Sequence, residues 1–409
     1  MLKSGLLLGS ATLSLAVAGC GDDPSGPEPE AEPITLAAAL AETGRHAGAG
    51  NDLLWGYRLA VDLLNERGGL AGRPVQLVIR DDESDPETSA RLYSGFVASD
   101  SIDALLGPYS SVITEAVIPV AEAAEIPLVA PLAAAPELWA GQQRQWSVQM
   151  LSPAPTYARG SVELAALGGA ETVALIYEDT AFPRSLANGV REAAGEHGLE
   201  LVLDQAYPAG EADHEALAAA ARDAGGDLFV IAGYGEDQVA LRIAVDEAGY
   251  VPVMLSVNSP ASPLFASGVG ELARCVAGGA PWVPAVRTSG FIADSQTLVG
   301  KYEAAEGTSP DHRPAGGFGA VEVMAEAIEA ALAEGGKLDP AAIRDQLFAL
   351  ETETVLGPFS VYPLGDSRAG AQRALEGVQI QWQDDEEGGL ALRIVHPEAL
   401  AEAFPCFLR

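Results

Sequence analysis

The chain has 409 residues, 48% of them hydrophobic and 20% charged, which is enough material for two soluble domains. Its 58 acidic residues outnumber its 23 basic ones and give a formal net charge of −35. Because nucleic acids and anionic lipid surfaces are bound by basic faces, this balance argues against both as partners.

The first twenty residues, MLKSGLLLGSATLSLAVAGC, have the pattern of a bacterial lipoprotein signal peptide. Lys3 precedes an apolar stretch from Leu6 to Ala18 that is too short for a stable membrane span, and the segment ends in VAGC. We expect Cys20 to become the lipid-carrying first residue of the mature chain. The alternative is an ordinary secretory signal with a chance cysteine.

Residues 21–33, GDDPSGPEPEAEP, are rich in proline, glutamate and glycine and cannot form a core. We therefore expect a flexible tether that holds the protein on the extracytoplasmic face of a bacterial membrane. Whether that membrane is the inner or the outer one stays open.

From residue 34 onward, short apolar runs alternate with amphipathic helices. The expected helix over residues 51–68 places Leu54, Tyr57 and Val61 at three- and four-residue spacing, and RGG ends it. The expected strands of this half are 34–40, 74–80, 103–107 and 126–131, with further helices over 86–99 and 110–125.

The same rhythm restarts after LSPAP at residues 151–155. Here the expected strands are 172–178, 199–205, 227–233 and 251–257, and the expected helices are 156–167, 183–197, 213–224 and 236–248. The tail is less regular, with helices expected near 290–305, 316–334 and 339–350 and strands near 358–362, 378–382 and 390–395.

Apolar strands that show no alternation, each followed by a helix, are typical of parallel sheets covered on both faces. Two such runs predict an α/β protein made of two doubly wound lobes with parallel-rich sheets. In open parallel sheets, ligands bind beyond the carboxyl ends of the strands.

The stretch GPYSSVIT at residues 107–114 lies at such a place, after the third strand and at the start of a helix. Free backbone N–H groups at a helix N-terminus attract anionic or carbonyl oxygens. A serine there either caps the helix or binds a ligand. We favour capping for Ser110 and ligand contact for Ser111.

Cys275 and Cys406 are the two cysteines outside the leader. An oxidising compartment permits a disulfide between them, and two buried thiols are the alternative. The sequence does not decide, because it does not show whether the two Cα atoms come close enough.

Three stretches, GYRLAVDLLNERGGLAGRPVQLVIRDDESDP, LLGPYSSVIT and IPLVAPLAAAPEL, occur in an order that resembles the periplasmic leucine/isoleucine/valine-binding family. Its members are the extracytoplasmic solute-binding components of ABC uptake systems. The resemblance extends more loosely to about residue 382. It implies a type I periplasmic binding protein, with two lobes joined by a three-segment hinge that closes around a ligand.

The resemblance also implies where the lobes begin and end. The N-terminal lobe is expected to comprise residues 34–152 plus 285–357. The C-terminal lobe is expected to comprise residues 153–284 plus 358–409.

Carried over residue by residue, the resemblance implies a first-lobe half-site. Ser111 would hold a ligand carboxylate through its hydroxyl, and Tyr109 would add a neighbouring backbone contact. Ala133 and Ala134 fall in the turn where the amino-acid binders use a backbone group and then a threonine. The threonine hydroxyl is therefore missing at Ala134.

The second half-site would come from the other lobe. Phe182 falls where an aromatic side chain covers the ligand, with a plain core phenylalanine as the alternative. Tyr234 lies near another pocket tyrosine, and Asn258 falls where an acidic residue pairs with the α-ammonium. A buried ammonium needs such an acceptor, so a carboxylate, an amide or another polar solute fits better than a standard amino acid.

The loop at residues 42–52, ETGRHAGAGND, borders the expected cleft. Arg45 is able to pair with an acidic ligand group and His46 to hydrogen-bond it. For both we favour the alternative, a solvated loop residue.

The chain has no GxSxG, HExxH or GxxxxGK[ST] motif, and its five histidines are scattered without metal-ligand spacing. We therefore expect no catalytic residues, no metal and no cofactor. The expected function is capture of a small polar solute for an ABC permease and ATPase complex. The alternative is an anchored ligand sensor or regulatory lipoprotein on the same fold.

Overall fold

The computed structural model describes residues 32–99, 101–335 and 338–409. The expected signal peptide with Cys20, and the tether up to residue 31, lie outside the described residues. No helix in the described part of the chain is long and apolar enough to cross a membrane.

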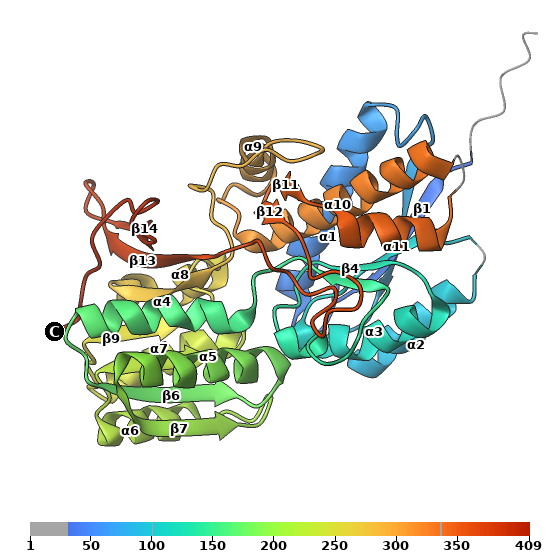
Figure 1. Ribbon diagram of the computed structural model, residues 1–409. Coiled ribbons are helices and arrows are strands. Elements are labelled where there is room, and N and C mark those ends of the chain that lie inside the picture. Colours follow the sequence, from blue (N-terminus) through green and yellow to red (C-terminus); the bar gives the residue numbers. More distant parts are fainter. Residues whose placement is uncertain (1–31, 100, 336–337) are drawn as a thin grey trace, which may run out of the picture.

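Two α/β lobes lie side by side (Figure 1). The first lobe is built on a five-stranded parallel sheet in the order β2-β1-β3-β4-β5. Its strands are β1 (Ile34–Leu40), β2 (Val75–Asp81), β3 (Ala104–Leu106), β4 (Leu128–Ala130) and β5 (Ser147–Gln149).

The second lobe has a seven-stranded sheet in the order β14-β13-β10-β9-β8-β6-β7. Its first five strands in the chain are parallel, and β13 and β14 add an antiparallel edge. These strands are β6 (Thr172–Glu178), β7 (Glu200–Tyr207), β8 (Leu228–Ala232), β9 (Met254–Val257), β10 (Val276–Ala280), β13 (Val378–Asp384) and β14 (Leu390–His396).

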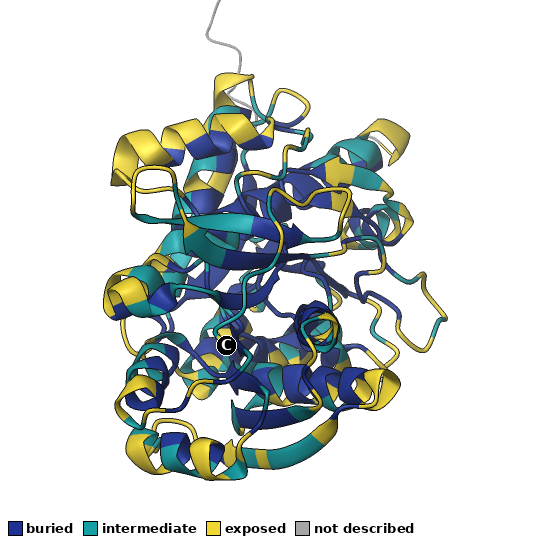
Figure 2. Cartoon of the chain, turned by 90° about the vertical axis from the view of Figure 1, so that its left-hand side faces the viewer, coloured by how far each residue is buried: buried dark blue, intermediate teal, exposed yellow. Residues whose placement is uncertain are grey.

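Helices cover both sheets, as the uninterrupted burial of β1 and β8 requires. The first lobe carries α1 (Ala47–Glu66), α2 (Pro86–Val97), α3 (Ser111–Ala124), α9 (Ser295–Glu306), α10 (His312–Gly335) and α11 (Pro340–Ala349). The second carries α4 (Ala154–Leu167), α5 (Ala181–His197), α6 (His214–Ala224), α7 (Gly235–Glu247) and α8 (Pro263–Val269). The inner faces of these helices are buried, whereas their outer faces are exposed (Figure 2).

The predicted α/β class with parallel-rich sheets is confirmed, and β1 and β6 have the predicted bounds. The elements that were not predicted include β5, β10 and α8. Strand β10 reads VAGGA, and glycine weakens the strand signal. An added Cβ at Gly278 would lie 1.9 Å from the Val257 carbonyl oxygen, so the backbones approach too closely for any side chain.

The chain changes sheets three times. It leaves the first sheet after β5, returns after β10 to form α9, α10 and α11, and enters the second sheet again at β13. A short hairpin of β11 (Thr352–Thr354) and β12 (Gly357–Phe359) precedes this last crossing. Residues beyond it stay beside β5, where Gln149 N–H donates to the Gly370 carbonyl at 2.8 Å. The chain therefore reaches the second sheet at Val378, later than the expected boundary at residue 358.

A disulfide joins Cys275, just before β10, to Cys406 near the C-terminus, with the two Cα atoms 5.5 Å apart. The Gln381 side chain lies between the two cysteines. Its Nε2 donates to both cysteine carbonyls, at 3.0 Å and 2.8 Å, and its Oε1 accepts from Cys406 N–H. The C-terminal segment is thereby fixed to the second lobe.

Glu322 is a fully buried carboxylate in the middle of α10. It accepts backbone N–H groups from Ile292 and Val355, each at 2.9 Å, and more distantly from Ala293. One side chain thus holds together α10, the segment that returns from β10 and the segment that follows β11.

Helices α1 and α10 pack so closely that only glycine fits at Gly56. A Cβ there would lie 2.1 Å from the Pro314 carbonyl oxygen. Gly300, in contrast, is an exposed glycine inside α9 with open space around its Cβ position.

We expect Gly56→Ala to lower the free energy of unfolding by about 1–3 kcal/mol, because the two helix backbones must separate. Gly300→Ala is expected to raise it by about 0.5–1 kcal/mol, the normal difference in helix propensity. Urea unfolding of both variants provides the comparison. A stabilising Gly56→Ala would show that α1 and α10 are not in backbone contact.

Candidate functional site

The two sheets repeat one topology, because β2-β1-β3-β4-β5 and β7-β6-β8-β9-β10 follow the same winding. The direction in which the chain adds strands reverses between β1 and β3 in the first sheet and between β6 and β8 in the second. In open α/β sheets, ligands bind beyond the carboxyl ends of the two strands at such a reversal. In the first lobe, β1 is followed by residues 41–46 and β3 by residues 107–110. In the second lobe, β6 is followed by residues 179–180 and β8 by residues 233–234. The two crevices face each other.

A cavity of about 30 Å³ lies between the lobes at this point, and we call it the cleft cavity. It holds no more than one or two water molecules, so a ligand enters only as the lobes separate. Its lining comes from both lobes: Tyr109, Ser110, Ser111, Leu132, Ala134, Leu151, Tyr157, Phe182, Tyr234, Asn258, Ser259, His312 and Arg313.

The two serines behave differently from our expectation. Ser110 occupies the N-cap position of α3 but makes no capping hydrogen bond, and its buried hydroxyl has no partner among the described residues. The predicted capping role is therefore wrong. Ser111 Oγ accepts from the backbone N–H groups of Ala134 and Ala135, at 3.1 Å and 3.3 Å. Its own proton remains available to a ligand oxygen.

Ala134 lines the cleft cavity, but Ala133 does not. The Ala133 carbonyl instead accepts from Gln149 Nε2 at 3.0 Å, which fixes the turn after β4 against β5. Asn258 lines the cavity from the second lobe, and its Oδ1 already accepts from Gly233 N–H at 2.9 Å. The Ala133 carbonyl oxygen and Asn258 Oδ1 would therefore each have to accept a second hydrogen bond in order to bind an ammonium group.

Tyr109, Phe182 and Tyr234 all line the cavity, as the sequence comparison implied. Their rings interlock across the cleft: Phe182 and Tyr234 lie 6.1 Å apart, and Tyr109 and Tyr234 lie 6.3 Å apart. His46 packs against both tyrosines with ring centroids 5.3 Å and 5.1 Å away. Burial and the charge of Arg45 lower the pKa of His46 to about 4, so its ring is neutral at pH 7.

The expectation of a solvated loop is wrong for His46, which is only 6% exposed. Arg45 is exposed, as expected, but its side chain also reaches across the cleft to the buried Glu178 at 2.6 Å. A second bond between the lobes joins Ser185 Oγ to Glu137 at 2.7 Å. These contacts hold the lobes in a closed arrangement.

Six lining residues were not predicted: Leu132, Leu151, Tyr157, Ser259, His312 and Arg313. Of these, Tyr157, His312 and Arg313 do not follow a strand end. Tyr157 lies in the first turns of α4, and the other two open α10. Arg313 Nη1 contacts Asp52 at 3.2 Å and Asp311 at 3.4 Å. Burial lowers the pKa of His312 to about 4, so Arg313 is the charged member of the lining at pH 7.

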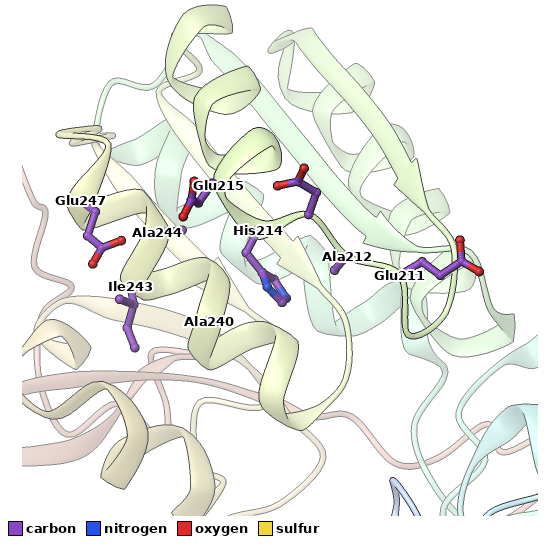
Figure 3. Close-up of a pocket in the computed structure, with 9 residues that line it drawn as sticks. Glu211, Ala212, His214, Glu215, Ala240, Ile243, Ala244 and Glu247 are labelled. Carbon is purple, nitrogen blue, oxygen red and sulfur yellow. The ribbon is translucent and has the colours of Figure 1, made fainter.

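A wider depression of about 640 Å³ lies on the surface of the second lobe, between α6 and α7 (Figure 3). Its lining combines four carboxylates, four apolar side chains and His214, which pairs with Asp237 at 2.9 Å. No lining side chain there is a buried group without a partner. Within the described residues, no group of three or more His, Cys, Asp or Glu side chains is arranged to hold a metal ion.

Comparison with known proteins agrees with this architecture. The family described as periplasmic binding protein matches residues 33–385. A relative from Brucella abortus, named Leu/Ile/Val-binding protein homolog 7, is 25% identical, covering 92% of this chain and 94% of its own.

Two solved structures share the fold. A leucine-binding protein from Thermotoga maritima has a TM-score of 0.76 and 19% identity, covering 90% of this chain and 99% of its own. A solute-binding protein of an ABC transporter from R. palustris, solved in complex with benzoate, has a TM-score of 0.75 and 18% identity, covering 91% and 99%.

Proposed function

Because the chain belongs to the periplasmic binding protein family, we propose that it is an extracytoplasmic solute-binding lipoprotein of an ABC uptake system. A small polar solute binds in the cleft cavity, and the lobes close around it as the hinge bends. The observation that carries this proposal is the meeting of both topological crevices at one cavity lined by polar groups from each lobe.

In the proposed mechanism the first lobe comprises residues 34–152 plus 285–377 and the second lobe comprises residues 153–284 plus 378–409, because the chain reaches the second sheet only at Val378. Three crossing segments join the lobes. The ligand-contacting set is the one expected from sequence without Ala133, namely Tyr109, Ser110, Ser111, Ala134, Phe182, Tyr234 and Asn258, with Arg313 added from the structure. Cys20 is the proposed lipid attachment site, and the permease and ATPase complex is the proposed partner.

The solute class is bounded by two comparisons. One fold neighbour is described as a leucine-binding protein and another was solved with benzoate. The cleft cavity has apolar walls and hydroxyl groups, which suit the apolar body and the carboxylate that these two ligands share. A thermal-shift screen of the purified protein across amino acids, amides and carboxylates tests the proposal directly, and a flat response to all of them would contradict it.

The second candidate is an anchored sensor that reads the same ligand without transport. The closed cleft is consistent with ligand binding by a transport protein and by a sensor, so it does not distinguish the two functions. Neighbouring genes for permeases and ATPases, and loss of solute uptake when this gene is deleted, distinguish transport from sensing.

We expect Ser111→Ala to weaken binding of the solute found in that screen by about 1–3 kcal/mol, roughly 5- to 150-fold. The hydroxyl is oriented by two backbone N–H groups, so its proton is directed to the ligand. Calorimetric titration measures the change. Ser94→Ala, which removes an exposed hydroxyl of α2, serves as the control. Unchanged affinity would remove Ser111 from the site.

A further inference from the structure

Four helices that begin beside the cleft start without a side-chain cap, as α4 and α8 also do. The N-cap residues of α1, α3, α5 and α7 make no side-chain capping hydrogen bond; they are His46, Ser110, Thr180 and Tyr234. The N-caps of α2, α6, α9 and α11 are aspartates that each accept a backbone N–H; they are Asp85, Asp213, Asp294 and Asp339. Free N–H groups and positive dipole ends therefore converge on the cleft.

Hydroxyl groups without partners lie at the same place. Ser110, Tyr157 and Tyr234 all line the cleft cavity, are 2%, 4% and 8% exposed, and have no hydrogen-bond partner among the described residues. Ser110 and Tyr234 are the N-cap residues of α3 and α7, so their hydroxyls lie at two of the helix ends described above. A buried hydroxyl without a partner is costly unless a ligand completes it.

Arg313 adds a positive charge to this donor set. Only Nη1 of its guanidinium hydrogen-bonds a carboxylate, that of Asp52, and its Nε and Nη2 have no acceptor among the described residues. Asp311 lies 3.4 Å from the same Nη1, so both carboxylates pair with one nitrogen of the guanidinium. A guanidinium with free donors is well suited to bind a carboxylate through two parallel bonds.

The lining offers little to an α-ammonium group. It contains no carboxylate, and the oxygens of Ala133 and Asn258 already accept hydrogen bonds. Desolvating an ammonium without such an acceptor is strongly unfavourable. The site thus favours an anion and disfavours a zwitterion.

The walls of the cavity are largely aromatic. Tyr157 and Phe182 meet edge to face with ring centroids 5.9 Å apart, and the tilted ring of Tyr234 lies 6.1 Å from that of Phe182. Aromatic pairs in such offset and edge-to-face arrangements are favourable beyond their buried area. A flat ring is therefore the ligand body that these walls accommodate with least displacement.

We propose that the solute is a small aromatic carboxylate without an α-ammonium group, held by Arg313, Ser110 and Tyr234, with its ring against Phe182. This inference rests on the proposed solute-binding function and names the class of solute.

The test is calorimetric titration of the purified protein with five probes: benzoate, benzamide, cyclohexanecarboxylate, phenylalanine and leucine. We expect benzoate to bind about 100-fold more tightly than benzamide, phenylalanine and leucine, because each of these lacks the anion or brings an ammonium. Cyclohexanecarboxylate, which keeps the anion without the aromatic ring, should bind about tenfold more weakly than benzoate.

Two variants locate the anion. Tyr234→Phe should weaken benzoate binding by about 10- to 100-fold without lowering the unfolding midpoint, because the hydroxyl has no protein partner. Arg313→Lys, which keeps the charge and removes the planar fork, should weaken it by at least tenfold. Tyr250→Phe is the matched control. Its hydroxyl donates to the Gly226 carbonyl at 2.5 Å, so this variant should lower the midpoint and leave affinity unchanged.

The outcomes separate the two levels of inference. If leucine or phenylalanine binds more tightly than benzoate, or if benzamide binds equally well, the aromatic-carboxylate class is wrong and the solute-binding function stands. If Tyr234→Phe and Arg313→Lys both bind benzoate like the wild type, the anion site is wrong. If no amino acid, amide or carboxylate binds at all, the proposed function fails together with the inference.

Discussion

Replacing Cys275 and Cys406 together by serine is expected to lower the free energy of unfolding by about 3–5 kcal/mol. The bridge spans 131 residues, so its loss releases a long loop in the unfolded chain. It also frees the C-terminal segment from Cys275, so that hydrogen bonds to Gln381, Gln383 and Val253 would then hold this segment. Urea unfolding with and without reductant measures the effect.

The control is the wild-type protein under reducing conditions, which should unfold at the same urea concentration as the double variant. Ligand affinity is expected to stay unchanged, because Cys275 lies at the amino end of β10 and the cleft lies beyond the carboxyl ends of the strands. Equal stability of the oxidised wild type and the double variant would show that the bridge constrains little.

Glu322→Ala is expected to lower the free energy of unfolding by about 3–5 kcal/mol, because it leaves buried backbone N–H groups of two crossing segments without an acceptor. Glu322→Gln is milder. The amide oxygen replaces one carboxylate oxygen, but its NH₂ faces an N–H donor, so we expect a loss of about 1–3 kcal/mol at pH 5.

The pH dependence of that loss tests the state of the carboxyl group. Burial raises the pKa of Glu322 to about 7 in the folded protein, against about 4.3 in an unfolded chain. Since the folded state then binds more protons, the contribution of Glu322 to stability is present below pH 4 and is lost as the pH rises through 7. The difference between wild type and Glu322→Gln should therefore shrink from pH 5 to pH 8. A difference that grows instead would show an ionised carboxylate in the folded state.

Much of the fold was predictable because its strands are short, apolar and uninterrupted. Strands β1 and β6 read ITLAAAL and TVALIYE, and no competing pattern fits them. Strand β10 was not predictable from its own amino-acid sequence, VAGGA. Its two glycines are required by the close approach of Gly278 to Val257 and of Gly279 to Tyr157, which depends on contacts distant in the sequence.

The residues of the candidate site also fall into a predictable group and a group that was not predictable. Ser111, Phe182 and Tyr234 follow strands directly, so their place beyond the sheet edge is a matter of topology. Arg313 starts a helix that no strand precedes, and it reaches the cleft only because α10 packs on α1. The unpartnered hydroxyl of Ser110 was not foreseen either, because the same residue in the same position normally caps its helix.

The triple crossing of the chain between the sheets governs the order in which the protein is able to fold during synthesis. All five strands of the first sheet precede the second lobe, yet α10, which covers α1 at Gly56, is made only after β10. Until then the apolar face of α1 has no cover, and an emerging chain with uncovered apolar surface is prone to aggregate. Neither lobe is a contiguous stretch of sequence, so neither forms a complete folding unit until most of the chain has left the ribosome.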